Sequence, residues 1–282
     1  MQDKIDGLRK KANYIRSQIL EMIASAGKGH IGGAFSCTDI LVTLFYGGIL
    51  RFDPANQNWS ERDRFILSKG HACTALYAIL ADLGYFAISE LRNYGQNGCM
   101  LRGHPDRKIP GIEVDTGSLG HGLGIAAGLA LGAKMDKKDY NTFVLLGDGE
   151  CYEGTVWESA MFSGHHHLNN LVAIVDRNGI CATDFIKDCL CLDHLDEKWK
   201  AFGWDVSVVD GHSFEELLSA FKSLSFRKSD KPLILIANTV KGKGVSFMEG
   251  NPIWHHTVPK GEELEIARKE LGWNTQDKRV LI

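Results

Sequence analysis

Two side chains with oxygen atoms that can bind a metal, Asp148 and Asn178, stand about thirty positions apart in the sequence. Each follows a short apolar run, at residues 142–146 and 171–175, and an amphipathic stretch lies between the runs, which predicts a strand, a helix and a second strand. Parallel strands joined by a crossover helix end at the same edge of a sheet, so we expect Asp148 and Asn178 to lie side by side. With a main-chain carbonyl such as that of Ile180, they would form a metal site with only a few oxygen ligands from the protein. Such a site suits magnesium, which keeps open positions for phosphates and water.

Glycines on both sides of Asp148 predict a close approach to a ligand. Gly147 and Gly149 leave the main chain accessible, and the helix that follows has free N–H groups that can bind a diphosphate. Alternatively, the Gly-Asp-Gly sequence could be an incidental turn in an unrelated strand–helix–strand unit. The spacing, both apolar runs and the terminal Asn178 together favour a diphosphate and metal site.

Histidines in glycine-rich segments are candidate acid–base groups, because imidazole titrates near neutral pH. His30 lies among four glycines in residues 27–33, which predicts a loop, and Ser36 or Thr38 is expected to cap the following helix. A lone histidine in such a loop is more often a turn residue than a catalyst. His71 follows a predicted strand and opens a helix, whose positive end favours a neutral imidazole.

Other histidines lie in the long polar segment and in the tail. His104 belongs to the segment 95–122, which is long for a connection inside a compact domain and is therefore expected to be functional. The tail carries His255 and His256. The run His165–His167 looks like a metal cluster, but consecutive residues of a helix point about 100° apart. That geometry favours a solvated helix end instead.

Helices and strands that alternate along the chain must position these groups. The predicted helices cover about 4–25, 68–84, 122–135, 153–167 and 213–224, and the predicted strands cover 64–67, 142–146, 171–175, 204–209 and 233–237. Ser213 and Glu216 form a predicted capping box. The pattern predicts an α/β fold with a parallel sheet flanked by helices on both faces. We expect residues 1–282 to be one domain, with an N-terminal helix and a C-terminal extension over about 241–282.

Composition excludes several classes of protein. The chain has 282 residues, of which 44% are hydrophobic and 24% charged, as in ordinary soluble domains. A net charge of −3 argues against a nucleic-acid partner, and no apolar stretch reaches the length of a membrane span. The seven cysteines are scattered without a CxxC pair, which indicates reduced thiols and a cytoplasmic location.

Five segments agree, in order, with one known family. They are GHIGGAFSCTDIL, DRFILSKGHACTALYAIL, RGHPDRKIPGIEVDTGSLGHGLGIAAG, the GDG unit and KGKGVSFMEGNPIWHH. Over nearly its whole length the chain resembles the N-terminal, diphosphate-binding half of a transketolase, and specifically the stand-alone N-terminal subunit of a split transketolase. The resemblance implies a thiamine-diphosphate-binding fold, and a transferase that moves a two-carbon ketol unit from a ketose or ketose phosphate to an aldose.

The same resemblance implies a role for each matching residue. Magnesium, or another divalent cation such as calcium or manganese, would be held by Asp148, Asn178 and the carbonyl of Ile180. The substrate channel would be lined by the catalytic residues His30, His104 and His255, and Glu153 would be an acid near the dimer axis. The other implied contacts with thiamine diphosphate are His71, Gly117, Ser118, Leu119, Gly147, Gly149 and Glu150, with His255 again among them.

Two histidines depart from the family pattern. His121 stands where the family usually has glutamine, and His256 where it usually has glycine. His255 is favoured over His256 as the channel residue by its position.

The resemblance also implies a partner. In this family a pyrimidine-binding domain supplies the glutamate that activates the cofactor, and the sequence has no room for that domain. We therefore expect a separate C-terminal subunit in a 2+2 assembly, with the cofactor at the interface, and no turnover by this chain alone. Sugars or sugar phosphates are the expected substrates.

Three alternatives stay open at this point. The chain could belong to a related enzyme acting on a modified, branched or sulfonated sugar, to a carboligase of the 1-deoxyxylulose 5-phosphate synthase type, or to a non-catalytic cofactor-binding relic. The metal pair and the channel histidines argue against a relic, and His30 and His104 favour a ketose donor over pyruvate. A dehydrogenase is disfavoured, because no GxGxxG follows a strand with an acidic residue about twenty positions later.

Overall fold

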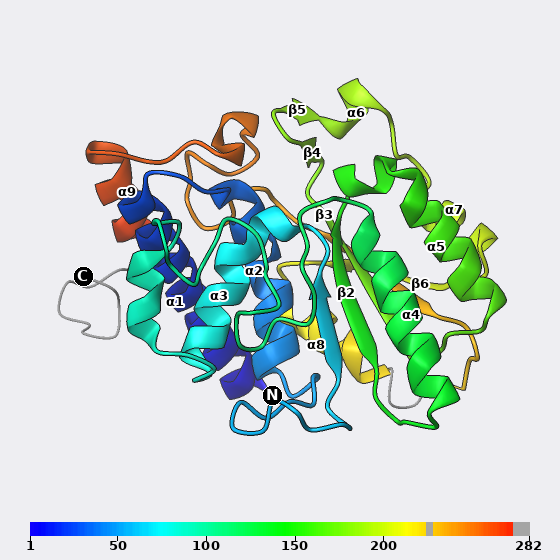
Figure 1. The fold of residues 1–282 in the computed structure, drawn as a ribbon. Helices are drawn as coiled ribbons and strands as arrows, with labels where there is room; N and C mark the ends of the chain where they lie inside the picture. The colour runs from blue at the N-terminus through cyan, green and yellow to red at the C-terminus, as the bar shows by residue number, and fades with distance from the viewer. Residues whose placement is uncertain (224–227, 273–282) are drawn as a thin grey trace.

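A five-stranded parallel sheet forms the centre of the molecule. In the computed structural model, which describes residues 1–223 and 228–272, the strand order is β1-β2-β3-β7-β6 (Figure 1). The strands are β1 (Arg64–Leu67), β2 (Thr142–Gly147), β3 (Leu171–Arg177), β6 (Asp205–Asp210) and β7 (Leu233–Asn238). A short antiparallel pair, β4 (Ile180–Cys181) and β5 (Asp184–Phe185), follows β3. The predicted parallel sheet is confirmed.

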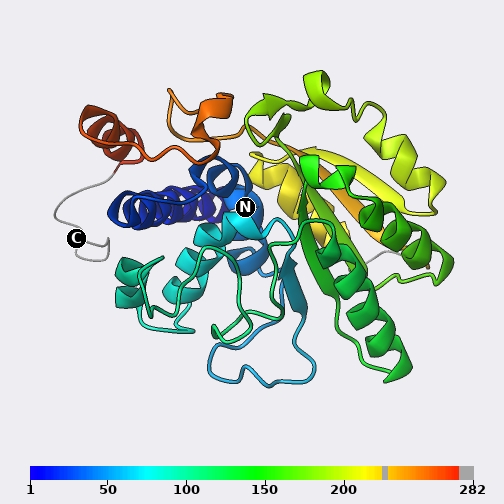
Figure 2. The ribbon, with the colours of Figure 1, turned by 45° about the horizontal axis from the view of Figure 1, so that its top comes forward.

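Helices cover both faces of this sheet, as predicted, because both faces of its central strands are apolar. Phe143 and Leu145 of β2 belong to one core, and Val144 and Leu146 belong to the other. Figure 2 shows the two groups of helices on opposite sides of the sheet. The first core is closed by α1 (Gln2–Ala26), α2 (Ile31–Tyr46), α3 (Cys73–Asp82) and α8 (Phe214–Ser223), and the second by α4 (His121–Met135), α5 (Gly154–His165), α6 (Ile186–Cys189) and α7 (Leu195–Ala201).

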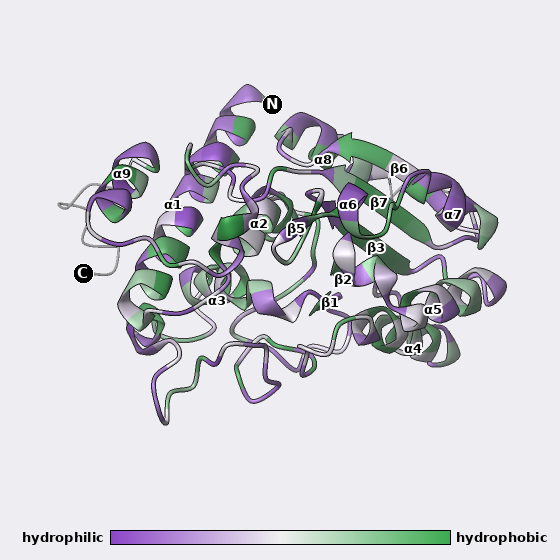
Figure 3. Ribbon diagram, turned by 90° about the horizontal axis from the view of Figure 1, so that it is seen from above, coloured by the Kyte–Doolittle hydropathy of each residue, from purple (hydrophilic) through white to green (hydrophobic). Residues whose placement is uncertain are grey.

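The outer helices are amphipathic. Figure 3 shows hydrophobic residues concentrated on β3 and β7 in the centre and hydrophilic residues on α7 and α9 (Glu262–Glu270) at the periphery. Arg268 of α9 forms an ion pair with Glu21 of α1 at 2.7 Å, which attaches the tail to the N-terminal helix. Within the described residues, no helix is both long and apolar enough to cross a membrane.

The predicted start of the second helix was wrong. The glycine-rich loop ends at His30, and Gly32 and Gly33 already belong to α2. A Cβ atom on Gly32 would lie 2.7 Å from the carbonyl oxygen of Trp254, so the glycine is needed for a close approach rather than for a loop. The predicted caps Ser36 and Thr38 lie inside the helix.

The predicted capping box of α8 forms only in part. The hydroxyl of Ser213 accepts a hydrogen bond from the main-chain N–H of Glu216 at 3.2 Å. The Glu216 carboxylate instead accepts from the N–H of Asp210 at 2.9 Å. Residue 224 of the predicted helix and residues 273–282 of the predicted extension lie outside the described residues.

Substitution of two glycines tests this packing. A Cβ atom on Gly164 of α5 would lie 1.9 Å from the carbonyl oxygen of Phe202, so Gly164→Ala should lower the free energy of unfolding by about 1–3 kcal/mol. On Gly128 of α4 a Cβ atom would meet nothing within 4 Å, so Gly128→Ala should raise it by about 0.5–1 kcal/mol. Urea denaturation followed by circular dichroism measures both. Equal effects of the two substitutions would contradict the packing described here.

Candidate functional site

A cavity of about 290 Å³ lies at the carboxyl edge of the sheet, where β1, β2, β3 and β7 end. It brings together most residues that the sequence singled out. The predicted residues that line it are His30, His71, His104, Gly117, Leu119, Gly147, Asp148, Gly149, Glu150, Asn178, Ile180 and His255. Ser118 and Glu153 are exposed and do not line it.

Asp148 and Asn178 stand at neighbouring strand ends, as expected from the strand–helix–strand pattern. The two oxygens of Asp148 accept hydrogen bonds from the N–H groups of Gly149, at 2.8 Å, and Gly179, at 2.6 Å. Burial, and secondarily the nearby carboxylate of Asp176, raise the pKa of Asp148 to about 6. A cation beside Asp148 would stabilise its ionised form.

The chemistry of this donor set fits a divalent cation and a diphosphate. The oxygen donors are one carboxylate, one amide and the carbonyl of Ile180, a hard set of the kind that magnesium binds. The amide oxygen of Asn178 accepts from the N–H of Ile180 at 3.1 Å, which fixes the turn between them. A Cβ atom on Gly149 would lie 2.9 Å from the sulfur of Cys181, so the glycine keeps this wall of the cavity open.

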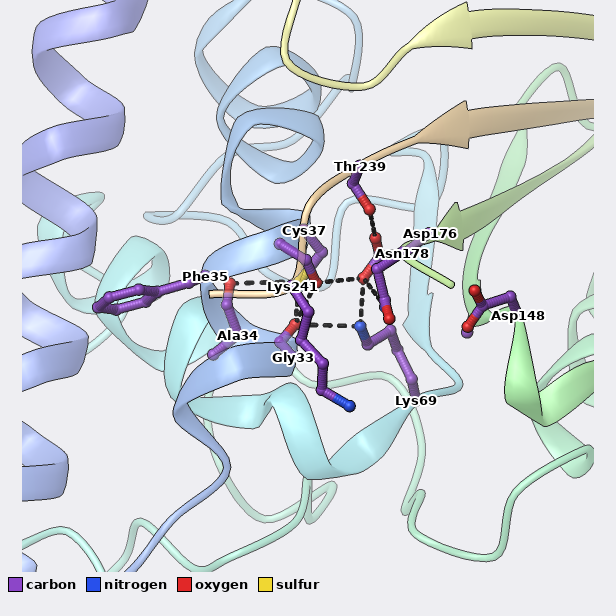
Figure 4. Close-up of polar contacts among 12 residues, drawn as sticks. Gly33, Ala34, Phe35, Cys37, Lys69, Asp148, Asp176, Asn178, Thr239 and Lys241 are labelled. Atoms are coloured by element: carbon purple, nitrogen blue, oxygen red, sulfur yellow. Dashed lines mark hydrogen bonds and ion pairs between the residues drawn. The ribbon is translucent and has the colours of Figure 1, made fainter. Parts of the chain in front are cut away.

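A buried ion pair joins Lys69, which lines the cavity, to Asp176. Both side chains are almost fully buried, at 1% and 0% exposure. Lys69 also donates to the carbonyl of Gly33 at 3.0 Å, and Asp176 accepts from the hydroxyls of Thr239 and Ser36, the latter at 2.6 Å (Figure 4). Burial alone would lower the pKa of Lys69, but Asp176 raises it to about 12, so the ammonium stays charged.

A second lysine, Lys241, contributes another positive charge to the cavity wall. Its ammonium group donates to the carbonyls of Ile180 at 3.2 Å and Ala182 at 3.1 Å. Burial, followed by the charge of Lys69, lowers the pKa of Lys241 to about 8. Two ammonium groups in the cavity wall favour an anionic ligand, and a diphosphate has the appropriate charge.

Four histidines converge in the same cavity, close to these lysines. The ring of His30 lies 5.4 Å from that of His71, 5.1 Å from that of His255 and 6.5 Å from that of His104, measured between ring centres. They come from the start of α2, the turn after β1, the tail and the polar segment, so only the folded chain assembles them. The Nδ1 atom of His255 is buried and has no hydrogen-bond partner in the described part of the chain.

Three of these imidazoles are held neutral. Burial is the largest cause in each case and lowers the pKa of His30, lowers that of His71 well below its usual range, and lowers that of His255 to about 3. The neighbouring lysines Lys69 and Lys241 and the other histidines act in the same direction. Neutral imidazoles can accept a proton or bind sugar hydroxyls.

Glu150 fixes the loop that precedes α4. Its carboxylate accepts hydrogen bonds from the N–H of Gly120 at 2.9 Å, the N–H of Gly147 at 3.0 Å and the hydroxyl of Ser68. Both oxygens are thus engaged within the protein, although the residue also lines the cavity. Glu150 therefore joins the ends of β1 and β2 to the loop carrying Gly117 and Leu119.

The other histidines singled out in the sequence, His121, His256 and His165–His167, lie in different parts of the structure. His121 is exposed at the start of α4, with its Nδ1 atom 3.2 Å from the carbonyl oxygen of Leu119. His256 is exposed and its ring centre lies 6.5 Å from that of His30, farther than His255. His165 and His166 have nearly perpendicular rings, and His167 instead faces Asp230 at 3.1 Å.

The chain is similar to known proteins over nearly its whole length. Residues 8–281 match the family described as transketolase, thiamine diphosphate binding domain. The chain belongs to the transketolase family. It is therefore a transketolase-type transferase with a thiamine-diphosphate-binding α/β fold, as the resemblance implied.

Two relatives of this transketolase-family chain are subunits of similar length. An apulose-4-phosphate transketolase subunit of Phocaeicola vulgatus is 42% identical over 95% of each chain. The 6-deoxy-6-sulfo-D-fructose transketolase subunit SqwG of Clostridium sp. is 42% identical over 94% of this chain and 96% of its own. The solved transketolase of Leishmania mexicana superposes with a TM-score of 0.90 at 29% identity, covering 98% of this chain but 42% of that one.

Removal of the buried ammonium should destabilise the fold. In Lys69→Met the carboxylate of Asp176 would remain buried without its cation, so we expect the free energy of unfolding to fall by about 3–5 kcal/mol. Guanidinium denaturation of the purified chain measures this.

The matched control is Lys241→Met, which removes a buried ammonium that donates to two carbonyls. We expect it to cost less than about 2 kcal/mol. If Lys241→Met lowered the free energy of unfolding as much as Lys69→Met, the ion pair with Asp176 would have no special role in stability.

Proposed function

We propose that this chain is the cofactor-binding subunit of a two-subunit transketolase. It would transfer a two-carbon ketol unit from a ketose phosphate to an aldose, together with a separate subunit that carries the pyrimidine-binding domain. The observation that carries this proposal is the single cavity that joins Asp148 and Asn178 with His30, His104 and His255. In this reading residues 1–282 act as one diphosphate-binding domain.

Similarity in length to named subunits supports the partner. The Phocaeicola and Clostridium relatives carry the word subunit in their names, and each aligns with this chain nearly end to end. The Leishmania transketolase is more than twice as long as the part that superposes. We propose a 2+2 assembly, with the cavity completed by the partner and the exposed Glu153 facing an intersubunit contact.

The residues of the cavity suit the cofactor and a metal ion. Thiamine diphosphate, when bound, supplies a nucleophilic carbon and an electron sink for cleaving the bond next to a carbonyl. Asp148, Asn178 and the Ile180 carbonyl would hold a divalent cation at the diphosphate, and Lys69 and Lys241 would add positive charge. His71 and the main chain of Gly117, Ser118, Leu119, Gly147 and Gly149 would complete the binding surface.

Three histidines would then move protons. His30, His104 and His255 line the same cavity, and burial keeps His30 and His255 neutral. A neutral imidazole can remove a hydroxyl proton from the donor sugar and return it to the acceptor. Positioned groups of this kind each contribute roughly 10²–10⁴ in rate.

A modified sugar is the second candidate substrate. The two relatives that align end to end are named for apulose 4-phosphate and 6-deoxy-6-sulfo-D-fructose. Both names describe sugars that carry an anionic group. We therefore propose that the substrate is anionic, and that branched or sulfonated ketoses be assayed beside ordinary ketose phosphates.

Affinity capture tests the two-subunit function. The tagged chain is isolated from its native source with thiamine diphosphate and magnesium, and mass spectrometry identifies the protein that accompanies it. We expect a stoichiometric partner with a pyrimidine-binding domain, and ketol transfer only when both subunits are mixed. Robust transfer by the purified chain alone would disprove the proposal.

Cofactor binding gives a second, activity-independent prediction. Asp148→Asn removes the one carboxylate of the proposed metal site, so magnesium-dependent affinity for thiamine diphosphate should fall at least about tenfold. Isothermal titration of the two-subunit complex, with and without magnesium, measures it. The control Asp136→Asn changes an exposed residue at the far end of α4 and should leave affinity unaltered. Unaltered affinity in Asp148→Asn would place the metal elsewhere.

A further inference from the structure

A second cavity, of about 300 Å³, adjoins the site and shares His30 and His104 with it. We call it the side cavity. Its other walls come from the link between α1 and α2 and from the polar segment that contains His104: Lys28, Gly29, Tyr94, Gly95, Gln96, Cys99, Arg102 and Gly103. A molecule extending from the histidines can therefore leave the main cavity in this direction.

The charged side chains that line the side cavity are positive. Lys28 and Arg102 line it, and its lining contains no carboxylate. Lys28 has no hydrogen-bond or ion-pair partner among the residues that the structure describes. Arg102 is 67% exposed and lies 3.5 Å from Asp106, so its guanidinium keeps donors for another partner.

The exposed side chain of Lys28 lies over the main chain of Gly95. A Cβ atom on Gly95 would lie 2.7 Å from Cε and 3.6 Å from Nζ of Lys28, so the lysine stem lies directly over this glycine. Gly95 has a φ of +70°, a conformation that glycine adopts without strain. The turn thus leaves room for the stem and brings the ammonium group to the cavity wall.

We propose that the side cavity is a subsite for the anionic group of the sugar, a phosphate or sulfonate. The assignment rests on the proposed ketol transfer, since it takes His30 and His104 to bind the sugar near its reacting end. A lysine ammonium provides a compact charge, and an arginine fork can bind two oxygens of a tetrahedral anion. This subunit would then contribute to recognising the anionic end of the substrate.

Selectivity between charged and neutral sugars tests the subsite. In the two-subunit enzyme, Lys28→Met keeps the length of the stem but removes the charge. We expect kcat/KM for an anionic ketose, divided by that for the neutral ketose erythrulose, to fall about fivefold to tenfold. Lys28→Arg should restore most of the ratio. Comparing a phosphorylated with a sulfonated ketose shows which anion depends more strongly on Lys28.

The control is Lys10→Met, because Lys10 is an exposed lysine of α1 outside both cavities. It should leave the ratio unchanged. Turnover with an unchanged ratio in Lys28→Met would overturn the subsite. Absence of turnover with every sugar would instead count against the proposed function.

Binding of inorganic sulfate tests the subsite without turnover. Sulfate titrated into the complex should shift the NMR signals of ¹³C-labelled lysine at Lys28 and of the imidazoles of His30 and His104. The apparent dissociation constant for sulfate should rise at least about threefold in Lys28→Met, and it should also rise at raised ionic strength. Shifts that persist equally in Lys28→Met, or no shifts at all, would overturn the proposal.

Discussion

The site depends on one buried ion pair, between Lys69 and Asp176. Removing two charges from water is costly unless hydrogen bonds satisfy their remaining donors and acceptors. Here they are satisfied by Gly33 and Ser36 of α2 and by Thr239 after β7. Because the partners come from the ends of β1, β3 and β7 and from α2, satisfying this pair fixes where four elements meet. The cavity walls are attached to those same four elements.

Close packing of a glycine main chain against Ser68 provides the second constraint. A Cβ atom on Gly122 would lie 2.2 Å from the hydroxyl of Ser68, so α4 begins directly against the end of β1. Ser68 in turn donates to Glu150, which holds the N–H of Gly120. The polar segment is therefore anchored where it reaches the cavity, which explains how a long connection can present His104 and Leu119 at defined positions.

Local sequence patterns were sufficient to locate the two proposed metal ligands, but not the lysine charges near them. Asp148 and Asn178 could be predicted to be neighbours because apolar runs and a crossover helix determine where strands end. Lys69 and Lys241 were missed, since a lysine beside glycines is usually exposed, and the partner that buries Lys69 lies 107 positions away. The capping prediction at Ser36 and Thr38 failed for a related reason. The N–H of Gly242 donates to the carbonyl of Gly32 at 3.1 Å and Lys69 donates to that of Gly33 at 3.0 Å, and these long-range contacts favour a helix that the local propensity of glycine disfavours.

The diphosphate and the sugar have opposite chemical requirements, and burial meets both. A diphosphate needs positive charge, which Lys69 keeps only because Asp176 compensates for its loss of water. Proton transfer at the sugar needs neutral imidazoles, and the same low polarity, together with nearby ammonium groups, keeps His30, His71 and His255 unprotonated. The lysines thus favour an anionic ligand and also keep the neighbouring histidines unprotonated. A charged group on the sugar would weaken this balance if it lay in the main cavity among all four histidines, which gives a physical reason to place it at Lys28, in the adjoining side cavity.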